Sequence, residues 1–173
     1  MKVEKKKVVL DVLRSPCVDI ETHEESEVVI RMLEVVLTEK SSFTSVAAPE
    51  ANILKRAAII RTPEFSIDLI NPIILTGVDK VLSFSEKCIS FDESVNCLRW
   101  SEITIENGLK REKLTLSGLS AILVQHEIDH LEGKVFFDRA IKMAVVREGG
   151  KIKLSGHCPC GSGKVFSTCC MKG

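Results

Sequence analysis

The chain has 173 residues, of which 45% are hydrophobic, and its 24 basic and 24 acidic residues give a formal net charge of zero. This composition excludes a disordered protein, and the longest apolar stretches fall far short of the roughly 20 residues that span a bilayer. No apolar segment of signal length follows the basic N-terminus, so we expect a cytoplasmic protein that does not enter a membrane.

Charge is distributed unevenly along the chain. Residues 141–173 contain six basic residues and one acidic residue, a local charge of +5, which leaves −5 on the remainder. A basic tail on an acidic body is compatible with a polyanionic partner such as RNA. It is equally compatible with a solvated terminus, and charge alone does not choose between them.

Hydrophobic periodicity predicts the elements of a single core. In chain order, we expect a short strand or lead-in at residues 8–13, a helix at 24–40, strands at 57–60, 67–75, 88–91, 97–105 and 110–116, and a second helix at 117–131. The Asn107-Gly108 pair predicts a hairpin turn, and Gly133 is placed to cap the second helix. This order predicts an α+β protein with antiparallel sheet around one buried helix.

The second expected helix contains an H-E-x-x-H motif. Residues four apart lie on one helix face, so His126 and His130 can bind one metal ion together. Glu127 would then lie beside the open coordination position, where a carboxylate can take a proton from a polarised water. The alternative is two surface histidines on a charged helix, but the apolar residues that flank the motif favour a buried helix and a metal site.

A third metal ligand must come from elsewhere in the chain, because a catalytic metal usually has three protein ligands. The two other histidines, His23 and His157, lie before the first helix and in the tail. Cys88, in the strand-like segment from Glu86 to Ser90, is better placed. A lone cysteine in a strand is more often a small buried hydrophobe, so the residues around it must decide.

Three segments resemble, in order, the motifs of peptide deformylases. The family has a G-x-G-Φ-A-A-P-Q loop, an E-G-C-Φ-S strand and a Q-H-E-x-D-H-Φ-x-G helix, and this chain has the corresponding segments at residues 43–50, 86–90 and 125–133. The resemblance covers at least residues 13–140. It implies a peptide-deformylase-like α+β fold, with antiparallel sheets around a central metal-binding H-E-x-x-H helix, and a catalytic domain over residues 1–148.

The resemblance also implies a metal-dependent hydrolase that removes the formyl group from N-formylmethionyl peptides. Cys88, His126 and His130 would hold the metal, which we expect to be Fe²⁺, with Zn²⁺, Ni²⁺ or Co²⁺ able to replace it. Glu127 would act first as base and then as acid, and the backbone N–H of Ile89 would face the developing oxyanion. The residues expected to contact substrate are Thr44, Ser45, Glu86, Lys87, Arg99, Ile122 and Leu123.

Several positions depart from the family pattern on the substrate side. Glu50 stands where the family has a glutamine whose amide donates to the oxyanion, and loss of such a donor costs about 3 kcal/mol. Burial beside Glu127 would favour a protonated Glu50 that can donate, whereas a nearby dication would oppose it, and the sequence leaves this balance open. Phe43 and Ser45 replace the two loop glycines, and Lys87 replaces the glycine before the metal cysteine.

The C-terminal segment contains a second motif. Residues 157–170 are similar to the SEC-C motif, and its four cysteines, Cys158, Cys160, Cys169 and Cys170, could close a tetrahedral structural Zn²⁺ site. His157 is an alternative ligand, and a segment this short would not fold without a metal. We expect a linker beginning at Gly149-Gly150 and a zinc-binding tail, together residues 149–173, that docks to the ribosome or to a protein partner.

Three functions therefore fit the sequence. The first is an active, monomeric deformylase with a zinc tail. The second is a deformylase-like binding protein that keeps the metal site without turnover, which Glu50 favours. The third is a general zinc endopeptidase, which the H-E-x-x-H motif alone supports, while Cys88 and the family-like Asn71-Pro72 pair oppose it.

Overall fold

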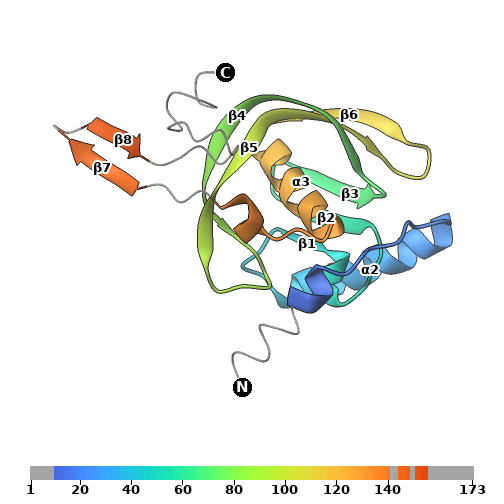
Figure 1. Ribbon diagram of the computed structural model, residues 1–173. Helices are drawn as coiled ribbons and strands as arrows, with labels where there is room; N and C mark the ends of the chain where they lie inside the picture. The colour runs from blue at the N-terminus through green and yellow to red at the C-terminus, as the bar shows by residue number, and fades with distance from the viewer. Residues whose placement is uncertain (1–9, 141–143, 149–150, 156–173) are drawn as a thin grey trace.

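The computed structural model describes residues 10–140, 144–148 and 151–155 (Figure 1). The elements are α2 His23–Glu39, β1 Ser45–Ala47, η1 Ala48–Ala51, β2 Ala57–Arg61, β3 Ser66–Ile70, β4 Ile73–Lys87, β5 Ser94–Asn107, β6 Glu112–Ser117, α3 Gly118–Leu131, η2 Phe136–Arg139, β7 Ala144–Glu148 and β8 Lys151–Ser155. The strands form antiparallel sheets of order β1-β2-β3, β4-β5-β6 and β7-β8, and Figure 1 shows α3 between the first two. The predicted α+β class is confirmed.

Helix α3 is central because its apolar residues pack against both sheets. Ala121, Val124 and Ile128 recur at helical spacing and are at most 1% exposed. The same core cluster includes residues of β1, β2, β3, β5 and β6, namely Ala47, Ala58, Ile60, Leu69, Ile103, Ile105 and Leu116. The helix begins after Ser117 and is followed by Gly133 at φ +70°, close to the predicted bounds.

Helix α2 packs against the sheet formed by β1, β2 and β3. Thr22 caps it by accepting a hydrogen bond from the N–H of Glu25, and Val29, Leu33 and Leu37 lie four apart on its buried face. These three residues belong to one core cluster with residues of β1 and β2. Burial of each leucine contributes about 2 kcal/mol, so the predicted helix is confirmed as a structural support rather than a source of site residues.

Strands β4 and β5 form a long hairpin that carries part of the site. Their register shifts twice, between Ile74 and Thr76 and between Ser83 and Glu86. Such bulges re-aim side chains, and after the second one Glu86 points at α3.

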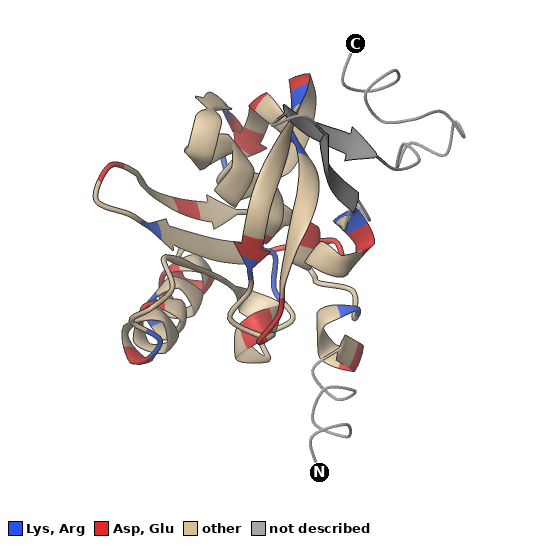
Figure 2. Ribbon diagram, turned by 90° about the vertical axis from the view of Figure 1, so that its left-hand side faces the viewer, with Lys and Arg blue, Asp and Glu red and all other residues tan. Residues whose placement is uncertain are grey.

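The acidic and basic residues of the described chain are interspersed in Figure 2. Among the described helices, none is long and apolar enough to cross a membrane.

Several expected elements differ from the structure. Residues 10–13 are helical rather than extended, because Leu10 and Leu13 lie three apart and pack into one cluster. The expected strand at 67–75 is split at Asn71, whose φ is +48° and whose side chain forms two hydrogen bonds with the backbone of Ile20. The expected strand at 88–91 is a turn that follows β4. Most of β4 was not expected, because its polarity does not follow its burial: Val78, Val81 and Phe84 are exposed, whereas Ser83 and Glu86 are buried.

A hairpin loop joins β5 to β6, and β7 and β8 form a separate pair of strands. Strand β5 ends at Asn107 and β6 begins at Glu112, with Gly108 at φ +78°, so the predicted turn is confirmed. Strands β7 and β8 pair antiparallel on either side of the expected linker glycines. The expected tail motif lies outside the described residues.

Close packing between Gly77 and Trp100 yields a test of the β4-β5 hairpin. A Cβ atom on Gly77 would lie 2.5 Å from two ring atoms of Trp100, closer than any real contact. We expect Gly77→Ala to lower the free energy of unfolding by about 1–3 kcal/mol, the usual range for overpacking. Denaturant unfolding measures this cost. In a Trp100→Ala background the same substitution should cost much less, and an equal cost in both backgrounds would contradict the packing argument.

Candidate metal centre

Three buried side chains from two parts of the fold converge at one point. His126 and His130 lie on α3, and Cys88 directly follows the end of β4. The Nε2 atoms of the two histidines are 3.2 Å apart, and Cys88 Sγ lies 3.4 Å from His130 Nε2. Their exposed fractions are 7%, 1% and 2%. The structure therefore brings together the three residues that the sequence proposed as ligands.

The donor set fits a divalent metal. In a tetrahedral site with metal–nitrogen distances of about 2.0–2.1 Å and a metal–sulfur distance of about 2.3 Å, ligand atoms lie about 3.3–3.6 Å apart. The observed separations are close to these values. Burial lowers the pKa of His130 to about 4, so its imidazole is neutral and can offer a lone pair. One thiol and two imidazoles suit Fe²⁺, Zn²⁺, Ni²⁺ or Co²⁺.

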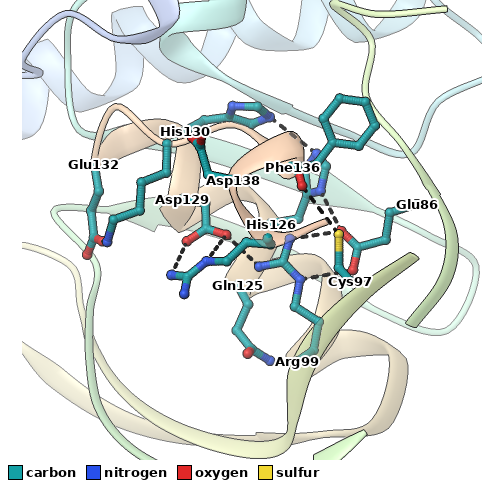
Figure 3. A network of polar contacts seen from close by, with 12 residues as sticks. Glu86, Cys97, Arg99, Gln125, His126, Asp129, His130, Glu132, Phe136 and Asp138 are labelled. Carbon is teal, nitrogen blue, oxygen red and sulfur yellow. Dashed lines mark hydrogen bonds and ion pairs between the residues drawn. The ribbon is translucent and has the colours of Figure 1, made fainter. Parts of the chain in front are cut away.

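A buried ion-pair network lies behind His126 (Figure 3). Glu86 accepts hydrogen bonds from His126 Nδ1 at 3.1 Å and from Arg99 at 2.9 and 2.8 Å. Arg99 also donates a hydrogen bond to Asp129 at 2.5 Å, and Arg139 donates a second one to the same carboxylate at 2.8 Å. Burial alone would raise the pKa of Glu86, but the hydrogen bonds from Arg99 and His126 hold it far below its usual range.

This network fixes the ring of His126 for metal binding. Although burial opposes it, the hydrogen bond with Glu86 raises the pKa of His126, and the ring presents Nδ1 to Glu86 and Nε2 to His130. Glu86 and Arg99 are 9% and 3% exposed and are joined by two hydrogen bonds, and Glu86 also supports the ligand His126. Their contact with substrate stays a prediction.

The sequence reading missed other polar residues that support α3. Gln125 accepts a hydrogen bond from the N–H of Trp100 and donates to its carbonyl, which locks α3 to β5. Asp129 and Arg139 extend the network, and Ser90 reaches Glu50. A signal was available for Gln125 and Asp129, since polar residues on a buried helix need partners.

Glu127 lies beside the ligands and has an unpaired oxygen. The residue is 1% exposed, and its Oε2 has no hydrogen-bond partner among the residues that the structure describes. Burial, and next the charge of Glu50, raise the pKa of Glu127 above its usual range, although a hydrogen bond with Ser45 opposes this shift. A buried, unpaired carboxyl oxygen with a raised pKa is suited to accept and return a proton.

Glu50, in η1, contacts two of the three ligands. Its Oε2 accepts a hydrogen bond from the N–H of Ala47 at 2.9 Å, and its Oε1 lies 2.9 Å from Cys88 Sγ and 3.2 Å from Ser90 Oγ. The side chain is 2% exposed, and Oε1 lies 3.7 Å from His130 Nε2. Burial, followed by the charge of Glu50, raises the pKa of the Cys88 thiol far above its usual range.

The remaining predicted residues lie around this centre or are not described. Thr44 and Lys87 are exposed, and Ser45, Ile122 and Leu123 are half-buried. Ile89 is also half-buried and lines a cavity of about 460 Å³, whose other walls are formed by Val12, Leu13, Val36, Lys40, Pro49, Glu50, Asn52 and Ser90. Leu123 packs partly against the core beside α3. The four tail cysteines, Cys158, Cys160, Cys169 and Cys170, lie outside the described residues.

Comparison with known proteins identifies the family. A family model described as polypeptide deformylase matches residues 4–145, and a SEC-C motif model matches residues 158–172. The peptide deformylase of Buchnera aphidicola is 38% identical over 99 residues, which cover 53% of this chain and 66% of that protein. The peptide deformylase of Halalkalibacterium halodurans is 34% identical over 139 residues, covering 67% and 76%. A class I type b peptide deformylase structure from Acinetobacter baumannii matches with a TM-score of 0.68 at 27% identity, over 75% of this chain and 93% of that one.

The network behind His126 predicts a loss of metal affinity when its charge is reduced. Glu86→Gln keeps the shape of the side chain but removes the charge that orients His126. We expect Zn²⁺ affinity, measured by chelator competition, to fall about 10- to 100-fold, as for other supporting partners of metal ligands. Glu132→Gln, at an exposed site, is the control. An unchanged affinity in folded Glu86→Gln protein would contradict the proposed role.

Proposed function

The chain belongs to the peptide deformylase family, and we propose that it removes the formyl group from N-formylmethionyl peptides. The observation that carries this proposal is the convergence of Cys88, His126 and His130 beside the unpaired carboxyl oxygen of Glu127. Together these residues could hold a divalent metal and move one proton. The Buchnera relative is matched over just under two thirds of its length, so the activity of this chain remains a proposal.

The proposed reaction is the hydrolysis of one amide bond. A divalent metal held by Cys88, His126 and His130, which we propose to be Fe²⁺ with Zn²⁺, Ni²⁺ or Co²⁺ as substitutes, would polarise the formyl oxygen and lower the pKa of the attacking water. Glu127 takes a proton from that water as its oxygen bonds to the formyl carbon. It then gives the proton to the leaving amine as the carbon–nitrogen bond breaks, so formate and a free amino terminus result.

The substrate would lie on the exposed side of this centre. We assign the backbone N–H of Ile89 to the developing oxyanion, and Thr44, Ser45 and Lys87 to the peptide backbone. Ile122 and Leu123, the half-buried apolar residues of α3, would contact the methionine side chain. We further propose that the protein acts as a monomer in the cytoplasm, where nascent chains are processed.

A second function is favoured by the position of Glu50. In the family motif this position is a glutamine, whose amide donates a hydrogen bond to the oxyanion, whereas Glu50 contacts the ligand Cys88 directly. An ionised carboxylate there would repel the oxyanion. The alternative is therefore a deformylase-like binding protein that keeps the metal but has little turnover. A general endopeptidase, the third candidate, is disfavoured by family membership.

Formate release from a formyl-methionyl peptide tests the first proposal. Full-length protein is purified without oxygen and loaded with Fe²⁺ or Ni²⁺. We expect turnover that Glu127→Ala lowers by about 10²-fold or more, because it removes the group that moves the proton. Activity that is absent in the native protein but present in Glu50→Gln would support the binding function instead, and casein cleavage without formate release would support an endopeptidase.

The tail yields a separate prediction. We propose that residues 149–173 form a linker and a structural Zn²⁺ site that docks to the ribosome or a protein partner, on the basis of the motif and the local charge of +5 over residues 141–173. Deleting residues 156–173 leaves both strands of β7-β8 in the chain. The deletion should lower the bound Zn²⁺ by one equivalent and weaken ribosome co-sedimentation at low salt. A Cys158→Ser, Cys160→Ser variant, which removes two of the proposed Zn²⁺ ligands, should show the same losses, and unchanged co-sedimentation of both variants would exclude ribosome docking.

A further inference from the structure

A cavity of about 260 Å³ lies among the β4–β5 hairpin, α3 and η2, and none of the three candidate metal ligands lines it. Arg99 and Asp129, which line the cavity, also belong to the ion-pair network of Figure 3. The cavity is thus separate from the proposed reaction centre, although part of its wall is made by residues that support that centre. The other residues of its wall that bear on its chemistry are Lys80, Trp100, Asp138 and Arg139.

Both carboxylates in the wall of this cavity are already paired with guanidinium groups. Asp129 accepts hydrogen bonds from Arg99 at 2.5 Å and from Arg139 at 2.8 and 3.1 Å. Asp138 accepts a hydrogen bond from Arg14 at 2.9 Å. Because each carboxylate has its own cation, the cavity does not favour a metal ion as its ligand.

Two cationic side chains of the wall keep donors that no described residue uses. Arg139 binds Asp129 through Nε and Nη2, and its Nη1 makes no hydrogen bond with another residue that the structure describes. Lys80 forms no ion pair with any carboxylate of the described ranges, and its Nζ lies 4.7 Å from the centre of the Trp100 ring. Hydrogen-bond donors of positive charge are therefore left for a ligand that accepts hydrogen bonds.

The charges around the cavity do not cancel. The cluster consists of the charged wall residues and of the two residues, Arg14 and Glu86, that pair with them from outside the wall. Its cations are Arg14, Lys80, Arg99 and Arg139, and its carboxylates are Glu86, Asp129 and Asp138. One positive charge is unbalanced, that of Lys80, so the cavity favours an anion.

The ammonium group of Lys80 is held beside the cavity before any ligand binds. Lys80 and Trp100 are paired across β4 and β5, and the ammonium lies over the indole ring at a distance typical of cation–π contacts. The ring itself is packed against Gly77. A group that is ordered in advance loses less conformational freedom when it binds a ligand.

We propose that this cavity binds a phosphate group through the ammonium of Lys80 and the guanidinium of Arg139. Both kinds of group bind phosphate in proteins. Ala140 also lines the cavity, and residues 141–173, which follow it directly, carry a local charge of +5. A positive segment next to a single phosphate site suits a chain of phosphates better than one free phosphate, so the expected source is the backbone of an RNA. The inference does not depend on the proposed activity, because no metal ligand and no proton-transfer group takes part.

The test measures the affinity of the full-length protein for a fluorescent single-stranded RNA of about 12 nucleotides over a range of salt concentrations. We expect Lys80→Gln to lower the affinity about threefold or more at low salt. The slope of log affinity against log salt should become shallower by about 0.7, the value for one phosphate contact on a single strand. Lys80→Arg keeps the charge and should stay close to wild type in both values. Lys113→Gln, which removes an exposed lysine of β6 that does not line the cavity, should change neither value.

Calorimetric titration with inorganic phosphate separates the two sources of the phosphate group. Loss of phosphate binding in Lys80→Gln with unchanged RNA binding would support the phosphate site and overturn RNA as its partner. Unchanged binding of both probes in folded Lys80→Gln would overturn the proposal, and so would a wild-type protein that binds neither probe. Neither readout uses formate release, so an inactive protein that loses RNA affinity on this substitution would contradict the proposed activity and still support the cavity as a phosphate site.

Discussion

The buried ion pairs of Arg99 are the interaction on which the site depends. Arg99 lies on β5, and it binds Glu86 at the end of β4 and Asp129 on α3, so one guanidinium joins three elements. Removing one partner from such a group would leave a buried charge uncompensated, which typically costs 3–5 kcal/mol. The network can therefore hold α3 in one position relative to the hairpin, and only in that position do His126 and Cys88 converge.

The rest of the fold makes that network possible. Gln125 binds the backbone of Trp100 on β5, which fixes the rotation of α3 about its axis. Gly77 lets the ring of Trp100 lie against β4, so the hairpin can close at that point. The bulge before Glu86 then turns this carboxylate toward His126. Metal-site geometry thus follows from hydrogen bonds and packing well away from the metal.

The sequence predicted the parts of this structure that are local. Periodicity was sufficient for α2 and α3, the four-residue spacing on a helix gave His126 and His130, and the resemblance of residues 86–90 to a family motif gave Cys88. It was insufficient for β4, whose alternation is interrupted by two register shifts and whose exposed positions include Val78, Val81 and Phe84. Arg99 was predicted to contact substrate from its place in the family resemblance, and the sequence does not show that it also pairs with Glu86 and Asp129.

The network behind His126 and the carboxyl group of Glu50 are two separate parts of the site. Glu86, Arg99 and Asp129 orient His126 from behind, and none of them contacts Glu50 in the contacts described above. The metal site proposed here therefore does not rest on the residue at position 50. Turnover, by contrast, is favoured by a hydrogen-bond donor for the developing oxyanion, which an ionised glutamate cannot supply. A single substitution next to Cys88 is thus expected to act on the chemistry of the site more than on the fold around it.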